Sequence, residues 1–286
     1  MSDTTELPIR VYTPDPLLAH PVKQLRDMLW DVWAGRELAW RLMVRDISAQ
    51  YRQTLLGYVW VFLPPLVSSL TFVFLNSQGV LQIEKTSIPY PAFAMLGTLL
   101  WQVFVDALQA PITSLQHGKQ MLVKINFPRE AILLSALGIV IFNFMIRLSL
   151  LIGVLIWFNV PFTSSILFVP LSVSALIVCG FAFGLILAPV GGLYGDVSRV
   201  IPVISGFWML LTPVVYPPMT KGLAGILATW NPVSPLIVTT REALTGQPLT
   251  FFPQFWIVFA GSLLLLVLGW IGFRIAMPHL IARIGA

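Results

Sequence analysis

Two charged residues, Asp106 and Arg147, lie within long apolar stretches of the sequence and are the first candidates for chemistry. A charge inside a membrane span is costly and marks a candidate functional site by default. At 1.5 Å of rise per residue, their predicted depths differ by roughly 9 Å, a gap that long side chains can bridge. Two interpretations stay open: a buried pair that fixes the packing of two helices, or an Arg147 that faces a transport pathway and meets an anionic phosphate group.

Sequence motifs for catalysis are absent. The chain has no glycine-rich phosphate loop of the form GxxxxGK[ST], which excludes ATP hydrolysis by that route. The three histidines, His20, His117 and His279, are far apart, and the apolar stretches hold no acidic pair. We therefore predict that the chain is not an enzyme and carries no catalytic residues, no metal site and no cofactor.

The composition indicates a membrane protein. Of the 286 residues, 57% are hydrophobic and only 10% are charged, whereas a soluble domain has about 25% charged residues. A span needs about 20 apolar residues, so the chain has room for six or seven spans and little else. The net charge of +5 does not indicate nucleic-acid binding, because membrane proteins gather Lys and Arg in cytoplasmic loops.

We predict an all-α integral membrane protein with six transmembrane helices. The predicted spans cover residues of about 55–75, 90–111, 131–158, 165–190, 199–212 and 253–273. Before them, residues 1–36 form a cytoplasmic tail and helix and residues 37–53 an interfacial amphipathic helix, while residues 54–286 form the transmembrane domain. Residues 213–250 are apolar but broken at Asn231 and Pro232, which predicts a pair of short re-entrant helices that dip into the outer leaflet and return.

The distribution of basic residues supports this topology. With the N-terminus in the cytoplasm, thirteen of the seventeen Lys and Arg fall on cytoplasmic segments: seven before the first span, three in residues 112–130, then Arg199, Arg274 and Arg283. Three fall outside, Lys85, Lys221 and Arg241. This asymmetry matches the positive-inside rule and predicts both termini in the cytoplasm of a protein of the inner membrane.

The helix at residues 37–53 has an apolar stripe beside basic residues. Trp40, Met43, Val44, Ile47 and Tyr51 recur at helical spacing, and Arg41, Arg45 and Arg52 fall on a different face. Tryptophan beside arginine is typical of a helix that lies in the membrane interface. The alternative is an amphipathic helix packed against the rest of the protein.

Aromatic residues are candidates for lining a channel, because their faces stack on sugar rings without requiring one identity. The candidates on the first and fifth spans are Tyr58, Trp60, Phe62, Phe207, Trp208 and Tyr216. The alternative is an ordinary aromatic belt at the membrane surface. Pro64 and Pro65 predict a kinked or broken first span, and the glycines of Gly180-Phe-Ala-Phe-Gly184 predict close helix packing in lipid.

Residues 112–130 are predicted to form a basic cytoplasmic loop with a short apolar helix. The candidate docking residues are Met121, Leu122, Lys124, Ile125, Asn126 and Phe127. Apolar side chains in a basic loop favour docking into a groove of another protein, here a separate ATPase. The alternative is a helix that folds back onto the bundle.

Four sequence segments resemble the ABC type-2 permeases that export polysaccharides. They are RDISAQYRQTLLGYVW at residues 45–60 followed by Pro64-Pro65, LVKINFPRE at 122–130, YGDV at 194–197, and TPVVYP at 212–217 followed by Asn231-Pro232. In that family they correspond to the entrance motif, the coupling-helix region, the second cytoplasmic loop and the outer re-entrant region. The resemblance covers nearly the whole chain from about residue 37.

The resemblance implies a homodimer joined to two separate nucleotide-binding ATPase subunits, which would bind ATP and Mg. The substrate would be a glycan on undecaprenyl diphosphate or another lipid anchor, and the form QYRQT favours O-antigen over capsule exporters. The helix at residues 37–53 would gate substrate entrance from among the membrane lipids, through Trp40, Arg41, Arg45, Tyr51 and Arg52.

Two other classes of function remain open. One is a multipass membrane enzyme, or a flippase without an ATPase partner, that acts on lipid-linked sugars. Its mark would be a catalytic carboxylate or His at the membrane edge, and the acidic candidates Glu84, Asp106, Asp196 and Glu242 are isolated. The other is a passive channel or secondary transporter, which internal repeats would favour; the two halves show no convincing match.

Overall fold

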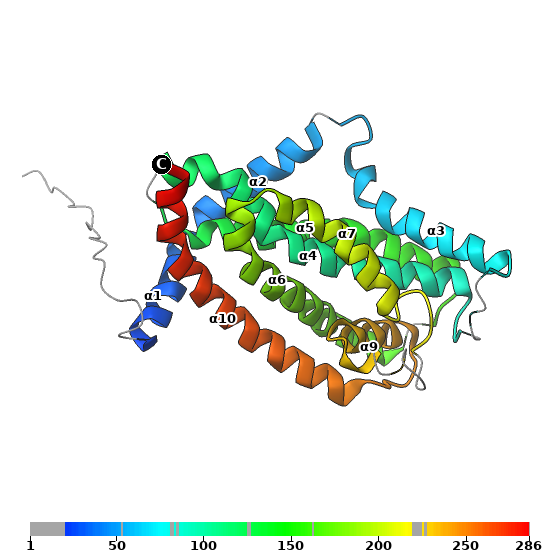
Figure 1. Ribbon diagram of the computed structural model, residues 1–286. Coiled ribbons are helices and arrows are strands. Elements are labelled where there is room, and N and C mark those ends of the chain that lie inside the picture. Colours follow the sequence, from blue (N-terminus) through cyan, green and yellow to red (C-terminus); the bar gives the residue numbers. More distant parts are fainter. Residues whose placement is uncertain are drawn as a thin grey trace, which may run out of the picture.

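The computed structural model describes residues 21–52, 54–80, 83, 86–124, 127–161, 163–218, 225 and 228–285, and its regular elements within these ranges are helices (Figure 1). In chain order they are α1 (Pro21–Ala34), α2 (Arg36–Arg52), the 3₁₀ helix η1 (Gly57–Val61), α3 (Leu63–Ser77), α4 (Tyr90–Lys124), α5 (Glu130–Trp157), the 3₁₀ helix η2 (Ser164–Phe168), α6 (Val169–Leu193), α7 (Asp196–Leu211), α9 (Val233–Thr245) and α10 (Phe252–Gly285).

Among the described residues, four helices are long and apolar enough to cross a membrane: α4, α5, η2 with α6, and α10. They coincide with the predicted second, third, fourth and sixth spans. In contrast, α3 has 15 residues and α7 has 16, lengths of roughly 22 and 24 Å at 1.5 Å per residue. Both fall short of a hydrocarbon core of about 30 Å. The structure thus supports a helical integral membrane protein, and the six-span count stays a prediction.

The predicted first span is two helices. The chain breaks at Phe62, and Pro64 and Pro65 occupy the first turn of α3. Proline is tolerated there because the first N–H groups of a helix have no intrahelical acceptor. The prediction of a break is confirmed, and its position is explained by this preference.

Helix α4 is longer than the sequence predicted. The predicted loop at residues 112–130 is wrong, because α4 continues through Pro111 as far as Lys124. A proline inside a helix removes one backbone hydrogen bond. Here the helix continues because Ile112, Leu115 and Leu122 beyond the proline are buried in the bundle. Burial of apolar side chains offsets the lost bond.

Close packing of α6 on α4 depends on glycine. A Cβ on Gly180 would lie 2.5 Å from the carbonyl oxygen of Phe104, and one on Gly184 would overlap that of Leu108. The two backbones therefore touch directly along this seam. The predicted close-packing role of these glycines is confirmed.

An ion-pair cluster joins three distant parts of the chain at one end of the bundle. Arg274 of α10 donates from Nη2 to Asp31 of α1 and from Nη1 to Glu130 at the start of α5, both at 2.9 Å. The two carboxylates are almost fully buried. The cluster therefore holds α1 and the C-terminal part of α10 at the end of the bundle where α5 begins, on the left in Figure 1.

The opposite end of the bundle holds α9. Ser165 of η2 donates from Oγ to the carbonyl oxygen of Ala243 in α9 at 2.9 Å. Helix α9 ends at Gly246, whose φ of 68° is the left-handed conformation that favours glycine at this position. The chain then turns into α10, which runs back towards the end that holds α1 (Figure 1).

Replacing Gly184 with alanine should lower the melting temperature of the purified chain, because the added Cβ forces the backbones of α4 and α6 apart. The matched control is Gly153→Ala in α5, where a Cβ would meet open space. That change should leave the melting temperature unchanged or raise it, since alanine favours a helix by about 1 kcal/mol over glycine. Equal melting temperatures for the two variants would contradict the close contact.

Replacing Arg274 with leucine should release α1 from the bundle, because Asp31 and Glu130 lose the guanidinium that they share. Losing one partner of a buried ion pair costs about 3–5 kcal/mol. Limited trypsin digestion should then cut faster at Arg26 in α1. Arg283→Leu, at an exposed position of the same helix, is the control and should digest as the wild type does. Unchanged cleavage in Arg274→Leu would show that apolar packing alone holds α1.

Candidate functional site

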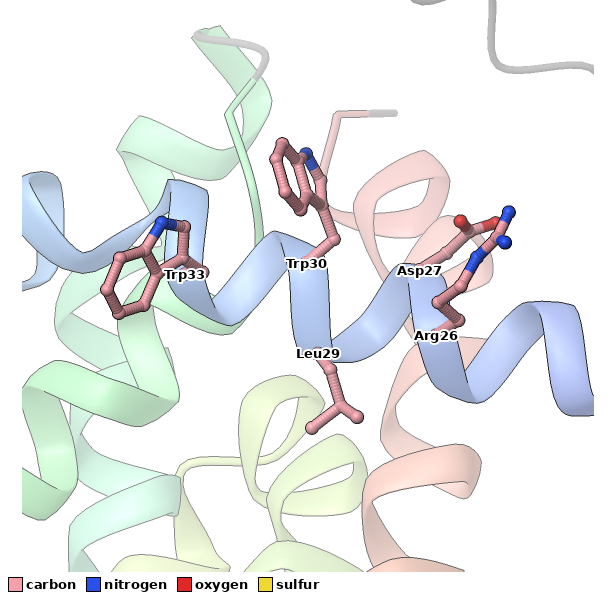
Figure 2. A pocket seen from close by; sticks show the side chains of 5 residues that line it. All are labelled: Arg26, Asp27, Leu29, Trp30 and Trp33. Carbon is pink, nitrogen blue, oxygen red and sulfur yellow. The ribbon is translucent and has the colours of Figure 1, made fainter.

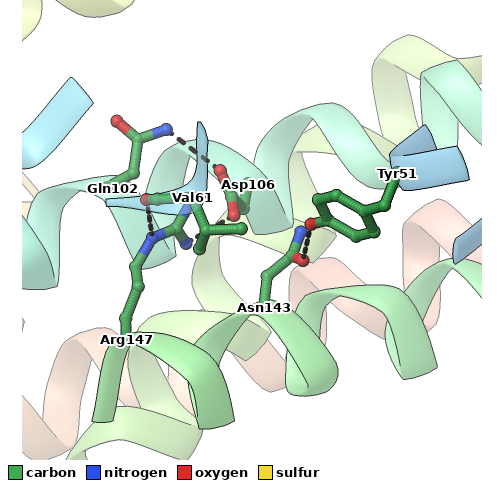
Figure 3. A network of polar contacts seen from close by, with 6 residues as sticks. All are labelled: Tyr51, Val61, Gln102, Asp106, Asn143 and Arg147. Carbon is green, nitrogen blue, oxygen red and sulfur yellow. Dashed lines mark hydrogen bonds and ion pairs between the residues drawn. The ribbon is translucent and has the colours of Figure 1, made fainter. Parts of the chain in front are cut away.

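The two charges within the apolar stretches form an ion pair. Arg147 Nη1 of α5 lies 2.5 Å from Asp106 Oδ2 of α4, and the two side chains are only 6% and 15% exposed (Figure 3). Asp106 also accepts a hydrogen bond from Gln102 Nε2 at 3.0 Å. The structure therefore contains the buried ion pair between two helices that was one of the two interpretations of Asp106 and Arg147.

Arg147 also donates a hydrogen bond at the break between η1 and α3. Its Nε donates to the carbonyl oxygen of Val61 at 3.2 Å. In a continuous helix, that carbonyl would accept from the residue four positions later, which is Pro65 and has no N–H. Arg147 supplies the missing donor, which satisfies a carbonyl that would otherwise be left without a partner in an apolar environment.

The end of α2 is attached to the same face of α5. Tyr51 donates from its hydroxyl to Asn143 Oδ1 at 3.0 Å, and its ring lies 4.5 Å from that of Tyr58. Burial raises the pKa of the Tyr51 phenol, so it stays a neutral donor. Asn143 and Arg147 are four residues apart and therefore lie on one side of α5. This side of α5 therefore holds the end of α2 through Asn143 and the end of η1 through Arg147.

The rest of α2 is turned differently from the predicted stripe. Ala39 and Leu42 are buried against the bundle, whereas Trp40 is 64% exposed and Val44 is exposed. The buried face is thus shifted by about one residue from the predicted one, and Tyr51 is buried because it reaches Asn143. Helix α2 packs on protein along one side and leaves an apolar strip free on the adjacent side.

The predicted basic residues of α2 remain near its surface. Arg41 pairs with Glu37 at 2.7 Å and Arg45 with Asp46 at 2.7 Å, and Arg52 is exposed. A pair between exposed side chains contributes little to stability. Arg52 is therefore available to a polar ligand or a lipid surface, whereas Arg41 and Arg45 would first have to leave their carboxylate partners. The predicted gate role of the three arginines stays a prediction.

The predicted channel aromatics do not share one environment. Tyr58, Trp60 and Phe207 are exposed, and Phe62 and Tyr216 are partly buried. Trp208 points into the bundle, where its ring lies edge-on to Phe104 at 5.2 Å. Its position is structural, so we no longer expect it to line an exposed channel with Phe207.

Asn231 joins the two segments of the predicted outer region. Its Nδ2 donates to Thr212 Oγ1 at 2.7 Å, and its Oδ1 accepts from Trp208 Nε1 at 3.2 Å and from the Val233 backbone N–H at 3.1 Å. The chain therefore returns to the end of α7 before α9 begins. Part of the first predicted re-entrant helix, residues 219–224, 226 and 227, lies outside the described residues.

The predicted docking segment is largely folded back onto the bundle. Leu122 is 6% exposed, and Met121 and Phe127 pack against the core. Ile125 and Asn126 lie outside the described residues. The burial of Leu122 disagrees with docking through that side chain, whereas docking through the partly buried Met121 and Phe127 stays a prediction. Among the described residues 121–124 and 127, Val123 and Lys124 at the end of α4 are exposed.

Helix α1 carries an exposed aromatic face that sequence reasoning missed. Leu29, Trp30 and Trp33 are each about 60% exposed, and they line an open cavity of about 480 Å³ with Arg26 and Asp27 (Figure 2). The buried side of the helix carries Met28 and Asp31. The signal was available, because apolar residues recur at helical spacing in residues 28–33.

A second missed feature is a polar cavity of about 680 Å³ between α2, α4 and α5. It reaches from the surface at Arg45 and His117 inward to Asp106 and Asn143. The signal was the spacing of polar residues within the apolar sequence of α4. Asp106, Gln109, Thr113 and His117 follow one another at intervals of three, four and four.

Residues 37–245 match the model of the ABC-2 type transporter family. Among curated relatives, the O-antigen export system permease protein RfbA of Myxococcus xanthus is 24% identical over 218 residues, which are 75% of this chain and 82% of the relative. An RfbA of Klebsiella pneumoniae is 22% identical over 226 residues, 78% and 86% of the two chains. The polysialic acid transport protein KpsM of Escherichia coli is 22% identical over 232 residues, 76% and 87% of the two chains. Helix α1 lies before the matched residues.

Replacing Arg147 with methionine should destabilise the chain by about 3–5 kcal/mol, because Asp106 is left buried without its counter-charge. Asp106→Leu combined with Arg147→Met should regain part of this loss, since no charge is then left alone. Unfolding of the purified variants measures both effects. Arg199→Met, which removes an exposed pair, is the control and should change stability little. If Arg147→Met instead assembles normally and abolishes transport, Arg147 serves the substrate path rather than the packing.

Proposed function

The chain belongs to the ABC-2 type transporter family, and on this premise we propose that it is the membrane-spanning permease subunit of an ATP-driven exporter of a lipid-linked polysaccharide. The observation that carries the proposal is the family match over residues 37–245 together with relatives named as polysaccharide exporters. O-antigen is the favoured substrate class, since two of the three relatives reported above are O-antigen export permeases and the third transports polysialic acid.

The proposed partners are a second copy of the chain and two ATPase subunits that bind ATP and Mg. An ATPase is required because the sequence has no phosphate loop of its own. Exposed apolar side chains on α3 and α7, among them Phe74, Val203 and Phe207, favour a face that is covered by lipid or by the second copy. The ATPase would meet the end of α4 near Val123 and Lys124, which are exposed there.

The proposed topology keeps six crossings and both termini in the cytoplasm. Helices α3 and α7 would make the two shorter crossings, with η1 extending the first. The described basic residues support this orientation. Arg274 pairs with Asp31 of α1, and Lys124 and Arg199 lie at the ends of α4 and α7 that are on the same side of the bundle. Arg241 lies in α9, at the opposite end (Figure 1).

The proposed route of the substrate begins at α2. Trp40, Arg41, Arg45 and Arg52 present apolar and basic groups at the surface of the helix, which suits a lipid with an anionic head group. Tyr51 attaches the end of α2 to α5 at the break before α3. A movement of α5 driven by the ATPase would therefore move the gate helix and the first crossing together.

Deleting the gene in its own organism should abolish surface polysaccharide while complete lipid-linked polysaccharide accumulates inside the cell, because synthesis does not need the permease. Surface labelling and extraction of lipid-linked glycans measure the two pools. Expression of the wild-type chain from a plasmid should restore the surface pool.

The same experiment tests the alternative of a membrane enzyme. Loss of an enzyme that acts on lipid-linked sugars would leave a shortened or chemically altered glycan rather than a complete one. An altered glycan, or a surface polysaccharide that persists unchanged after the deletion, would contradict the proposed function.

A further inference from the structure

One face of α4 carries a continuous polar stripe. Its members are spaced by four, three, four and four residues, so they lie on one side of the helix. They are Gln102, Asp106, Gln109, Thr113 and His117. The residues between them are mostly apolar and buried in the bundle. From Asp106 to His117 the stripe covers eleven residues, roughly 16 Å along the helix.

From Asp106 to His117, the stripe lines the cavity of about 680 Å³ between α2, α4 and α5. Helix α2 contributes Arg45, Asp46 and Gln50 to its lining, and α5 contributes Val140 and Asn143. The volume lies in the range of sites for small ligands. Its inner end is the Asp106–Arg147 pair, so the cavity leads from the surface into the apolar part of the bundle.

The charged groups of this cavity are already paired. Arg45 donates to Asp46 at 2.8 Å, and Asp106 is held by Arg147. A phosphate would have to displace a carboxylate from one of these guanidiniums. The cavity therefore favours a ligand without strong negative charge.

The remaining polar side chains of the lining are three amides, two hydroxyls and one imidazole: Gln50, Gln109, Asn143, Thr113, Ser114 and His117. Within the described residues, the side chain of Gln109 has no hydrogen-bond partner, although it is only partly exposed and lies in an apolar span. A polar group in such surroundings is costly unless water or a ligand satisfies it. An amide offers both donors and acceptors, and the Thr113 hydroxyl, whose proton bonds a backbone carbonyl of α4, offers an acceptor beside it. Alternating donors and acceptors suit the hydroxyl groups of a sugar ring.

We propose that this cavity binds a sugar unit of the exported glycan, through the side-chain amide of Gln109, the Nδ2 donor of Asn143 and the hydroxyl oxygen of Thr113 as an acceptor. The proposal rests on the proposed function and adds the site to it. The sugar unit that is attached to the lipid anchor would enter the cavity between α2, α4 and α5, while the anchor itself stays in the bilayer. A free oligosaccharide has the same chemistry but lacks the anchor that delivers it to this depth.

The test is equilibrium binding to the full chain, co-purified with its ATPase subunits and placed in lipid nanodiscs without nucleotide. Three fluorescent probes are compared: a polyprenyl diphosphate that carries a disaccharide, the same polyprenyl diphosphate without sugar, and the free disaccharide. The variants are Gln109→Leu and the nearly isosteric Thr113→Val. Gln120→Leu, the same change at an exposed position of α4 outside the cavity, is the matched control.

Gln109→Leu should weaken binding of the lipid-linked disaccharide about fivefold to tenfold, the effect of one or two lost hydrogen bonds. Thr113→Val should weaken it in the same direction, and Gln120→Leu should not. Binding of the sugar-free lipid should stay unchanged in all three variants, and the free disaccharide should bind much more weakly than the lipid-linked one.

Two outcomes would overturn the proposal. Equal weakening of the sugar-free lipid would show that the cavity takes the diphosphate, and unchanged binding in both cavity variants would show that it takes neither. If the gene deletion leaves surface polysaccharide in place, the proposed function itself fails. If the deletion behaves as expected while the cavity variants bind normally, only the sugar site is lost.

Discussion

The central part of this bundle depends on two interactions of one group, the guanidinium of Arg147, with Asp106 and with Val61. It neutralises Asp106 inside an apolar helix pair and also gives Val61 the hydrogen bond that Pro65 cannot give. A charged carboxylate and a free carbonyl would each be costly at this depth. One side chain removes both costs, and in doing so it joins α5 to α4 and to the break before α3.

The side of α5 that carries Arg147 also carries Asn143, which holds the end of α2 through Tyr51. The other end of α5 begins at Glu130, which pairs with Arg274 of α10 beside Asp31 of α1. Helix α5 is therefore attached by polar contacts to the gate helix, to the first crossing and to both ends of the described chain. A transport cycle that shifts α5 would act on all of these elements at once.

Prediction from sequence worked best where one local rule decides. The glycines of α6 confirmed the close-packing motif, and the spans at α5 and α6 were placed within a few residues. Prediction worked least well where the end of a helix, or the direction in which a side chain points, depends on the packing of neighbouring helices. Helix α4 does not end at Pro111, because the apolar residues beyond it are buried. Trp208 points inward because its ring packs against Phe104 and its indole N–H donates to Asn231.

The sequence by itself determined that the chain is a helical membrane protein without its own ATPase motif. Hydropathy and short motifs are properties of consecutive residues and do not depend on tertiary contacts. The sequence also showed Asp106 and Arg147 as the charges that need an explanation. Only the tertiary structure decided that they meet, that Arg147 reaches Val61, and that the polar stripe of α4 lines a cavity beneath α2. These contacts join residues that are 41 and 86 positions apart. Helical periodicity fixes the face of each residue along its own helix, whereas the face that a neighbouring helix covers is fixed by packing.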